Sequence, residues 1–138
     1  LPFTALAFER GLTLDTKLDA ELFVKGDSQA LTQLLAILID NALKYASSGS
    51  AVTVRLARQK KQALLSVHNE GEVIPQDALP HLFDRFYRVD KSRARAQGGY
   101  GLGLSIAKTI ASAHGGNIRA ESSAEHGTSF TITLPLSE

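Results

Sequence analysis

The amino-acid sequence predicts a two-layer α+β fold, and three observations support this class. Apolar and polar residues alternate along several short segments, which is the pattern of half-buried strands. Along two longer segments the apolar residues recur every three or four positions, as they do on amphipathic helices. The two patterns are interleaved along the chain, and a short polar turn joins two neighbouring strand segments. Such a mixture favours helices packed against one sheet.

The first part of the chain is predicted to contain a strand, a second short strand and a long helix. Leu12 and Leu14 alternate with polar residues over residues 11–18, and residues 22–24 form the second apolar segment. Asp27 and Ser28 are residue types that cap helix N-termini. The helix after them is expected to extend to about residue 46, where serines and a glycine end it. Its apolar positions follow helical spacing and are Leu31, Leu34, Leu35, Leu38 and Ala42.

The remaining sequence is predicted to add a hairpin, two helices and two strands. The expected hairpin pairs residues 51–58 with residues 63–68. A loop over residues 70–76 and a short helix over residues 77–82 are expected after it. A mobile loop (84–101), a helix (102–114) and two final strands (118–121 and 129–134) are expected to complete the chain. The hairpin is predicted because its two segments alternate and the polar residues 59–62 join them. Gly115 and Gly116 are expected to end the last helix, since glycine adopts the left-handed conformation that closes helices.

Composition and charge narrow the classes of function. The 138 residues are the size of one domain, and we expect residues 1–138 to form a single unit. The formal net charge is +1, so no overall field attracts nucleic acid or a membrane surface. The absence of Cys excludes a disulfide framework, a thiolate metal site and a Cys nucleophile. Because Met is also absent and Leu1 begins the chain, we expect a fragment of a longer protein.

A glycine-rich run is the sharpest functional signal. Residues 98–104 read Gly-Gly-Tyr-Gly-Leu-Gly-Leu and lead directly into a predicted helix. Glycine lets backbone amides approach a ligand, and a helix N-terminus attracts anions, so phosphate is the expected guest. The run lacks the Gly-Lys-Ser/Thr of a P-loop and the third spaced glycine of a dinucleotide fingerprint. The alternative is a flexible loop with a helix cap.

A second signal is a polar stripe on the long predicted helix. Ile37, Asn41, Lys44 and Tyr45 share one face at spacings of three and four. An amide oxygen suits Mg²⁺, a lysine can contact phosphate, and a tyrosine ring offers a flat surface to a base. The alternative is a solvent-facing stripe without a ligand.

Two weaker signals lie between these. Residues 67–75 form a strand end followed by a turn, which is a common place for ligand contacts but equally an ordinary loop. Residues 81–97 contain five Arg and Lys residues and two acidic residues, with aromatic residues among them. Arginine recognises phosphate well, whereas one short cluster gives poor support for nucleic-acid binding. The four histidines show no metal-ligand spacing, and we find no nucleophile.

In this order, the motifs resemble the ATP-binding catalytic domain of bacterial sensor histidine kinases. This fold, the Bergerat ATP-binding fold, is shared with the gyrase, Hsp90 and MutL ATPases. The resemblance extends from about Leu12 to Leu134 and includes Gly-Thr-Ser-Phe at residues 127–130. It implies a mixed sheet of about five strands packed on three helices, with ATP and Mg²⁺ bound between the long helix and the mobile loop.

The resemblance also implies roles for individual residues. Asn41 matches the Mg²⁺ ligand, Lys44 a phosphate contact, Tyr45 the ring beside adenine, and Asn69 the acceptor of the adenine amine. The basic residues Arg88 and Arg93 match positions near the γ-phosphate. Phe83 and Phe86 match one aromatic motif of the family. The other positions that match the nucleotide site are Gly71, Ile74, Phe86, Gly99, Gly101, Leu102, Gly103, Leu104 and Thr128.

Three positions depart from the family pattern. Asn69 replaces an Asp, so its amide still accepts the adenine hydrogen bond but lacks the charge of a carboxylate, and we expect weaker binding. Val73 replaces a glycine, which predicts a stiffer loop and a narrower pocket. Ile37 lies where the ATPase branches have a Glu that activates water, and Ile cannot act as a base. This feature disfavours an autonomous ATPase.

The implied function is phosphoryl transfer from ATP to a histidine that this chain does not contain. That histidine is expected on a phosphoacceptor hairpin of the parent kinase, with a response regulator downstream. The domain is expected to be cytoplasmic and monomeric, and the parent a homodimeric membrane sensor. The alternatives are a degenerate binding module, an ATPase of the wider superfamily, and a Ser/Thr kinase of the anti-sigma type. Mg²⁺-dependent ATP affinity separates the first of these alternatives from a kinase.

Overall fold

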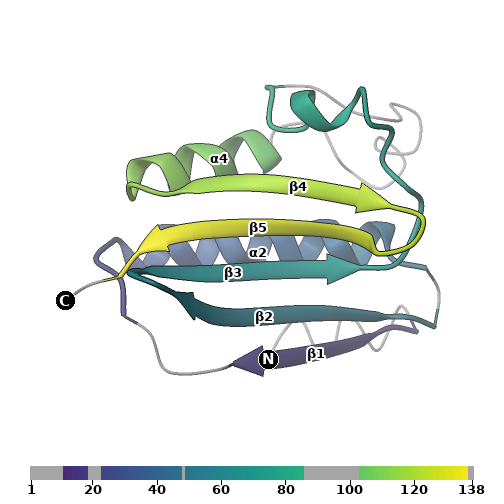
Figure 1. Ribbon diagram of the computed structural model, residues 1–138, viewed down its shortest axis with the longest axis horizontal. Helices are drawn as coiled ribbons and strands as arrows, with labels where there is room; N and C mark the ends of the chain where they lie inside the picture. Colours follow the sequence, from purple (N-terminus) through teal and green to yellow (C-terminus); the bar gives the residue numbers. More distant parts are fainter. Residues whose placement is uncertain (1–10, 19–22, 48, 86–102, 137–138) are drawn as a thin grey trace.

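The computed structural model describes residues 11–18, 23–47, 49–85 and 103–136. These residues form one five-stranded sheet with helices packed against it (Figure 1). The elements in chain order are β1 (Thr13–Leu18), α2 (Ser28–Tyr45), β2 (Ala51–Gln59), β3 (Gln62–Asn69), the 3₁₀ helix η1 (Leu79–His81), α4 (Gly103–Ala113), β4 (Asn117–Ser123) and β5 (Gly127–Pro135). The predicted α+β class and the sheet of about five strands are confirmed.

The sheet is mixed, as expected. Its strand order is β1-β2-β3-β5-β4, and only β1 runs parallel to its neighbour among the described strands. The predicted hairpin is β2–β3, where Arg58 pairs with Ala63 and Gln59 with Gln62. Because β3 and β5 are antiparallel neighbours, the end of β3 lies beside the start of β5, with Asn69 opposite Thr128.

The core lies between the sheet and the two helices. Helix α2 packs on β2 and β3, α4 packs on β4 and β5, and the helices also contact each other. Alternate residues of the strands face this layer; Val54, Val67 and Phe130 are in register across three strands and all are buried. Burial of such side chains contributes about 1.5–3 kcal/mol each and holds the helices on the sheet.

Local chemistry determines the start of α2 and the end of α4. The carboxylate of Asp27 accepts hydrogen bonds from the backbone N–H groups of Gln29 and Ala30 and so caps α2. Helix α4 ends in a Schellman motif, in which Gly115 has φ +76° and the Gly116 N–H donates to the Ala111 carbonyl at 2.9 Å. The predicted N-cap and glycine end are therefore confirmed.

One histidine joins these two helix ends. His114 Nε2 accepts a hydrogen bond of 3.1 Å from the Asp27 N–H, while its Nδ1 donates to the Ile110 carbonyl at 2.8 Å. The ring also lies against Gly26, where a Cβ would collide with it. The start of α2 is thereby attached to the end of α4.

Two predicted elements were wrong. Phe23 and Val24 lie outside the sheet; this short apolar segment packs Val24 on the core and leads into the α2 cap, while Phe23 is 67% exposed. In place of a helix over residues 77–82, the chain forms turns and a single turn of 3₁₀ helix. Pro80 lies near its start and lacks the N–H that a longer helix would need.

The described residues therefore contain two α-helices, α2 and α4, and one short 3₁₀ helix, where the family resemblance implied three helices. The expected mobile loop over residues 84–101 lies outside the described residues from residue 86 onward. In the part of the chain that is described, no helix has both the length and the apolar character that a membrane span requires.

Candidate functional site

The C-terminal half of α2 carries the predicted polar stripe. Asn41, Lys44 and Tyr45 are all half-buried, whereas Ala42 and Leu43 between them point into the core. Lys44 Nζ lies 3.1 Å from the carboxylate of Asp40, one turn earlier, with side-chain exposures of 24% and 42%. This ion pair keeps the ammonium group near the helix surface, where phosphate can reach it.

The surroundings of Asn41 are compatible with a role as a metal ligand. Its side chain forms no hydrogen bond with any of the residues that the structure describes. A half-buried amide oxygen of this kind is a ligand that Mg²⁺ accepts together with water and phosphate oxygens. The donor type and the exposure of Asn41 therefore fit the predicted magnesium contact.

Asn69 ends β3 as a buried polar residue, with 4% of its surface exposed. Its Nδ2 donates a hydrogen bond of 3.3 Å to the Glu70 carbonyl. A carbonyl can only accept, so this contact assigns the nitrogen of the amide and leaves Oδ1 as the atom that can accept from a ligand. An acceptor at this position is what the family resemblance implied.

Backbone contacts attach the loop after β3 to the end of α2. Ser47 N–H donates to the Glu70 carbonyl at 2.7 Å, and Ala46 pairs with Gly71 in an isolated β-bridge. A Cβ at Gly71 would overlap the carbonyl oxygen of Tyr45. The glycine is therefore required because two backbones meet here. Asn69 and Tyr45, which are distant in sequence, come to lie at the same end of the fold.

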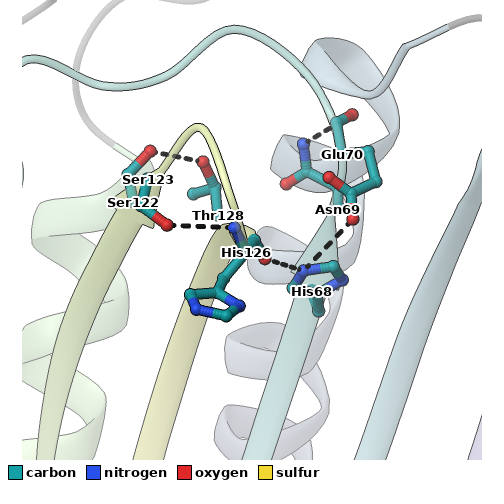
Figure 2. A network of polar contacts seen from close by, with 7 residues as sticks. All are labelled: His68, Asn69, Glu70, Ser122, Ser123, His126 and Thr128. Carbon is teal, nitrogen blue, oxygen red and sulfur yellow. Dashed lines mark hydrogen bonds and ion pairs between the residues drawn. The ribbon is translucent and has the colours of Figure 1, made fainter.

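Thr128 is the second residue of β5, lies opposite Asn69 and is 5% exposed. Its Oγ1 lies 2.8 Å from the Oγ of Ser122, which is also buried, at the end of β4 (Figure 2). The Ile74 N–H donates to the same Ser122 oxygen at 2.8 Å, and Gln76 Nε2 donates to the Ser122 carbonyl at 3.1 Å. The predicted residues Asn69, Ile74 and Thr128 are thus held together.

Ser122 and Gln76 were not predicted from the sequence. Ser122 follows Ile118 and Ala120 at alternate positions of β4, so the strand period places its hydroxyl on the buried face. A serine in that position needs a hydrogen-bond partner inside the protein. This signal was available in the sequence, but the identity of the partners was not.

A further hydrogen bond, on the face of the sheet opposite to Asn69, connects the end of β3 to the turn before β5. His68 Nε2 lies 2.6 Å from the His126 carbonyl oxygen in the turn between β4 and β5 (Figure 2). The His126 N–H in turn donates to Ser123 Oγ at 3.0 Å. Glu70 Oε1 lies 3.9 Å from the His68 ring. These contacts fix the turn that carries Thr128 relative to Asn69.

The N-terminus of α4 lies beside the polar stripe. A Cβ at Gly103 would lie 3.5 Å from Ile37 Cγ2, one helical turn before Asn41. Leu104 packs against the core. The last glycine of the predicted phosphate loop is therefore close to α2, at a helix N-terminus, which is a kind of position where proteins bind anions.

Of the other predicted positions, the structure describes some and not others. The ring of Phe83 makes an edge-to-face contact with Phe130, with centroids 6.0 Å apart, and so anchors the segment after η1. Val73 is 44% exposed. The remaining predicted site residues lie outside the described part of the chain, and they are Phe86, Arg88, Arg93, Gly99, Gly101 and Leu102.

Known proteins of similar sequence are sensor histidine kinases. Sensor histidine kinase WalK of Bacillus subtilis is 48% identical over 122 residues, which are 87% of this chain and 20% of WalK. Sensor histidine kinase RppB of Synechocystis is 37% identical over 135 residues, which are 97% of this chain and 30% of RppB. The chain thus spans only a fifth to a third of the length of these curated relatives.

Solved structures show the same fold. The mycobacterial sensor histidine kinase MprB superposes with a TM-score of 0.80 at 28% identity, covering 98% of this chain and 93% of that one. The catalytic domain of histidine kinase ThkA gives 0.83 at 26% identity, covering 97% and 85%. The family model described as "Histidine kinase-, DNA gyrase B-, and HSP90-like ATPase" matches residues 26–138. This chain therefore belongs to the histidine kinase-, DNA gyrase B- and HSP90-like ATPase family.

Proposed function

We propose that this chain binds Mg-ATP and presents the γ-phosphate to a histidine on a phosphoacceptor hairpin of a parent sensor kinase. The observation that carries the proposal is the attachment of the loop after β3 to the end of α2, through Ser47, Glu70 and Gly71. Through this attachment the buried acceptor Asn69 lies at the end of α2 that carries the polar stripe, which consists of Asn41, Lys44 and Tyr45. Membership of an ATPase family with sensor kinase relatives supports the same function.

The buried end of the sheet binds the base in this proposal. Asn69 Oδ1 accepts a hydrogen bond from the adenine amine, and Thr128 lies opposite it on the neighbouring strand. Tyr45 is half-buried at the end of α2 and supplies a ring that covers the base. A hydrogen bond in such a buried place discriminates strongly, because a wrong base leaves polar groups unpaired.

The phosphates extend from the base toward α2 and the start of α4. Lys44 contacts a phosphate oxygen in exchange for part of its contact with Asp40, and the amides around Gly103 bind another. Asn41 would hold Mg²⁺, which when bound neutralises phosphate charge. We also assign Gly99, Gly101 and the arginines Arg88 and Arg93 to the phosphate site, which is a prediction from their motif.

Transfer requires positioning of the donor and the acceptor more than covalent chemistry by this chain. A histidine nitrogen of the hairpin attacks the γ-phosphorus, a P–N bond forms, and the bond to the bridging oxygen of the leaving ADP breaks. Lys44 and the predicted arginines neutralise the charge that develops. Ile37, which lies beside Gly103, has no group that accepts a proton from water. We therefore infer transfer to histidine rather than steady hydrolysis.

The setting of the parent protein belongs to the proposal as well. We propose a single catalytic domain that is monomeric by itself and located in the cytoplasm. Its parent is a homodimeric membrane sensor whose phosphohistidine passes the phosphoryl group to a response regulator.

Calorimetric titration with a non-hydrolysable ATP analogue, with and without Mg²⁺, tests the proposal. A Kd below about 1 mM that falls further with Mg²⁺ is the expected result. No binding by a folded sample would contradict the proposal and favour a degenerate binding module. Radiolabel transfer from ATP to an added histidine hairpin is the second readout. Transfer to a serine of a partner protein instead would indicate a Ser/Thr kinase.

Hydrolysis separates the kinase from the ATPase alternative. We expect only slow phosphate release by the isolated chain, because Ile37 cannot act as a general base toward water. Steady hydrolysis that persists in Ile37→Ala would contradict this part of the proposal and favour an ATPase.

A further inference from the structure

Ser122 is a buried serine whose hydroxyl contacts two parts of the proposed base site. It is 6% exposed and is the second-last residue of β4, opposite Thr128 near the start of β5. Its Oγ accepts a hydrogen bond of 2.8 Å from the Ile74 N–H and lies 2.8 Å from Thr128 Oγ1. Its carbonyl accepts from Gln76 Nε2 at 3.1 Å. This serine therefore links the loop after β3 to the strand that carries Thr128.

The hydrogens available favour one direction for the bond between the two hydroxyl groups once a ligand is bound. Ser122 Oγ uses one lone pair for the Ile74 N–H, and its own single hydrogen needs an acceptor. Among the described residues, Thr128 Oγ1 is the acceptor within reach. If Thr128 donated instead, the Ser122 hydrogen would be buried without a partner, which is unfavourable. If Ser122 donates, the Thr128 hydrogen is instead available to a ligand in the proposed base site.

We propose that Ser122 is a positioning residue that makes Thr128 a hydrogen-bond donor and thereby sets the base preference of the site. This inference rests on the proposed function. In this arrangement Asn69 Oδ1 accepts a hydrogen bond from the base, and Thr128, its partner in the β3–β5 register, donates one. Adenine offers an amino donor beside a ring-nitrogen acceptor, which is the complement of this pair. Hypoxanthine, the base of ITP, offers a carbonyl acceptor beside an N–H donor, which is the reverse.

Ser123 provides a matched control one residue away. Its Oγ accepts a hydrogen bond of 3.0 Å from the backbone N–H of His126, inside the turn between β4 and β5. Ser122→Ala and Ser123→Ala therefore each remove one hydroxyl group that accepts a hydrogen bond from a backbone N–H. Only the first substitution removes the donor to Thr128.

The experiment is calorimetric titration of the wild-type chain, Ser122→Ala and Ser123→Ala with non-hydrolysable analogues of ATP and ITP. We expect the wild type to prefer the ATP analogue, and Ser122→Ala to reduce that preference about tenfold or more. Ser123→Ala should leave the preference unchanged. A serine that only supports the loop would weaken both analogues equally, so an unchanged ratio in Ser122→Ala would overturn the proposal.

Thr128→Val keeps the proposal testable if Ser122→Ala does not fold, because valine preserves the shape of threonine without its hydroxyl. It should reduce the preference to a similar extent, and an unchanged preference would overturn the proposal. Where both variants fold, the double variant should reduce the preference no further than either single one, since both act on one bond. Additive losses would contradict this. A wild-type chain that binds neither analogue would contradict the proposed function itself.

Discussion

The Cα of Gly71 lies against the carbonyl oxygen of Tyr45, so close that a Cβ on the glycine would overlap that oxygen. The contact joins the loop after β3 to the end of α2, and the adjacent Ser47–Glu70 hydrogen bond reinforces it. Because these two segments carry the acceptor Asn69 and the polar stripe of α2, their contact determines the shape of the proposed site.

Gly71→Ala is expected to destabilise the fold by about 2 kcal/mol or more, because backbone must move to admit the methyl group. It should also weaken binding of an ATP analogue severalfold. Urea denaturation and calorimetry measure the two effects. For the stability measurement alone, Gly103→Ala is the control, since its Cβ would meet Ile37 at an ordinary contact distance of 3.5 Å. Equal stability of Gly71→Ala and the wild type would contradict the close approach.

Asn41→Ala should lose most of the Mg²⁺-dependent gain in ATP affinity while the fold remains stable. The side chain is half-buried and forms no hydrogen bond within the described residues, so its removal costs the fold little. Calorimetry with and without Mg²⁺ measures the gain. Asn117→Ala, at the exposed start of β4, is the matched control. If Asn41→Ala kept the full Mg²⁺ effect, the metal role would be wrong.

Asn69→Asp should tighten binding of the ATP analogue severalfold, because a carboxylate accepts the adenine hydrogen bond with its full charge. The same change should destabilise the unliganded protein by about 1 kcal/mol, since the Glu70 carbonyl loses its donor. Affinity and stability are therefore expected to change in opposite directions. Unchanged or weaker binding would count against the assignment of Asn69 to the base.

Asp27→Ala should destabilise the protein by about 1 kcal/mol through loss of the N-cap of α2. His114→Ala should cost a similar amount, because the Asp27 N–H loses its acceptor and the two helix ends separate. Urea midpoints measure both, with the exposed Asp77→Ala as the control. A midpoint of Asp27→Ala equal to that of Asp77→Ala would show that the cap contributes nothing.

The sequence by itself determined the elements whose cause is local. Helix α2 follows from its apolar spacing and the Asp27 cap, α4 ends where Gly115 permits a left-handed residue, and β2–β3 alternate around a polar turn. Motifs also named Asn41, Asn69 and Thr128 as site residues. The predicted helix over residues 77–82 was wrong: an α-helix begun at residue 77 would need the N–H that Pro80 lacks, and a single 3₁₀ turn forms instead.

Only the tertiary structure decided how these pieces meet. Periodicity cannot show that β5 lies between β3 and β4. It therefore cannot show that Thr128 on β5 lies opposite Asn69 on the neighbouring strand β3. Nor does it reveal that Ser122 receives the Ile74 N–H, because that bond joins residues that are 48 positions apart in the sequence. Strand order and long-range hydrogen bonds result from packing of the whole sheet against α2 and α4. A hydroxyl at a buried strand position predicts that a partner exists, and only the fold determines which residue it is.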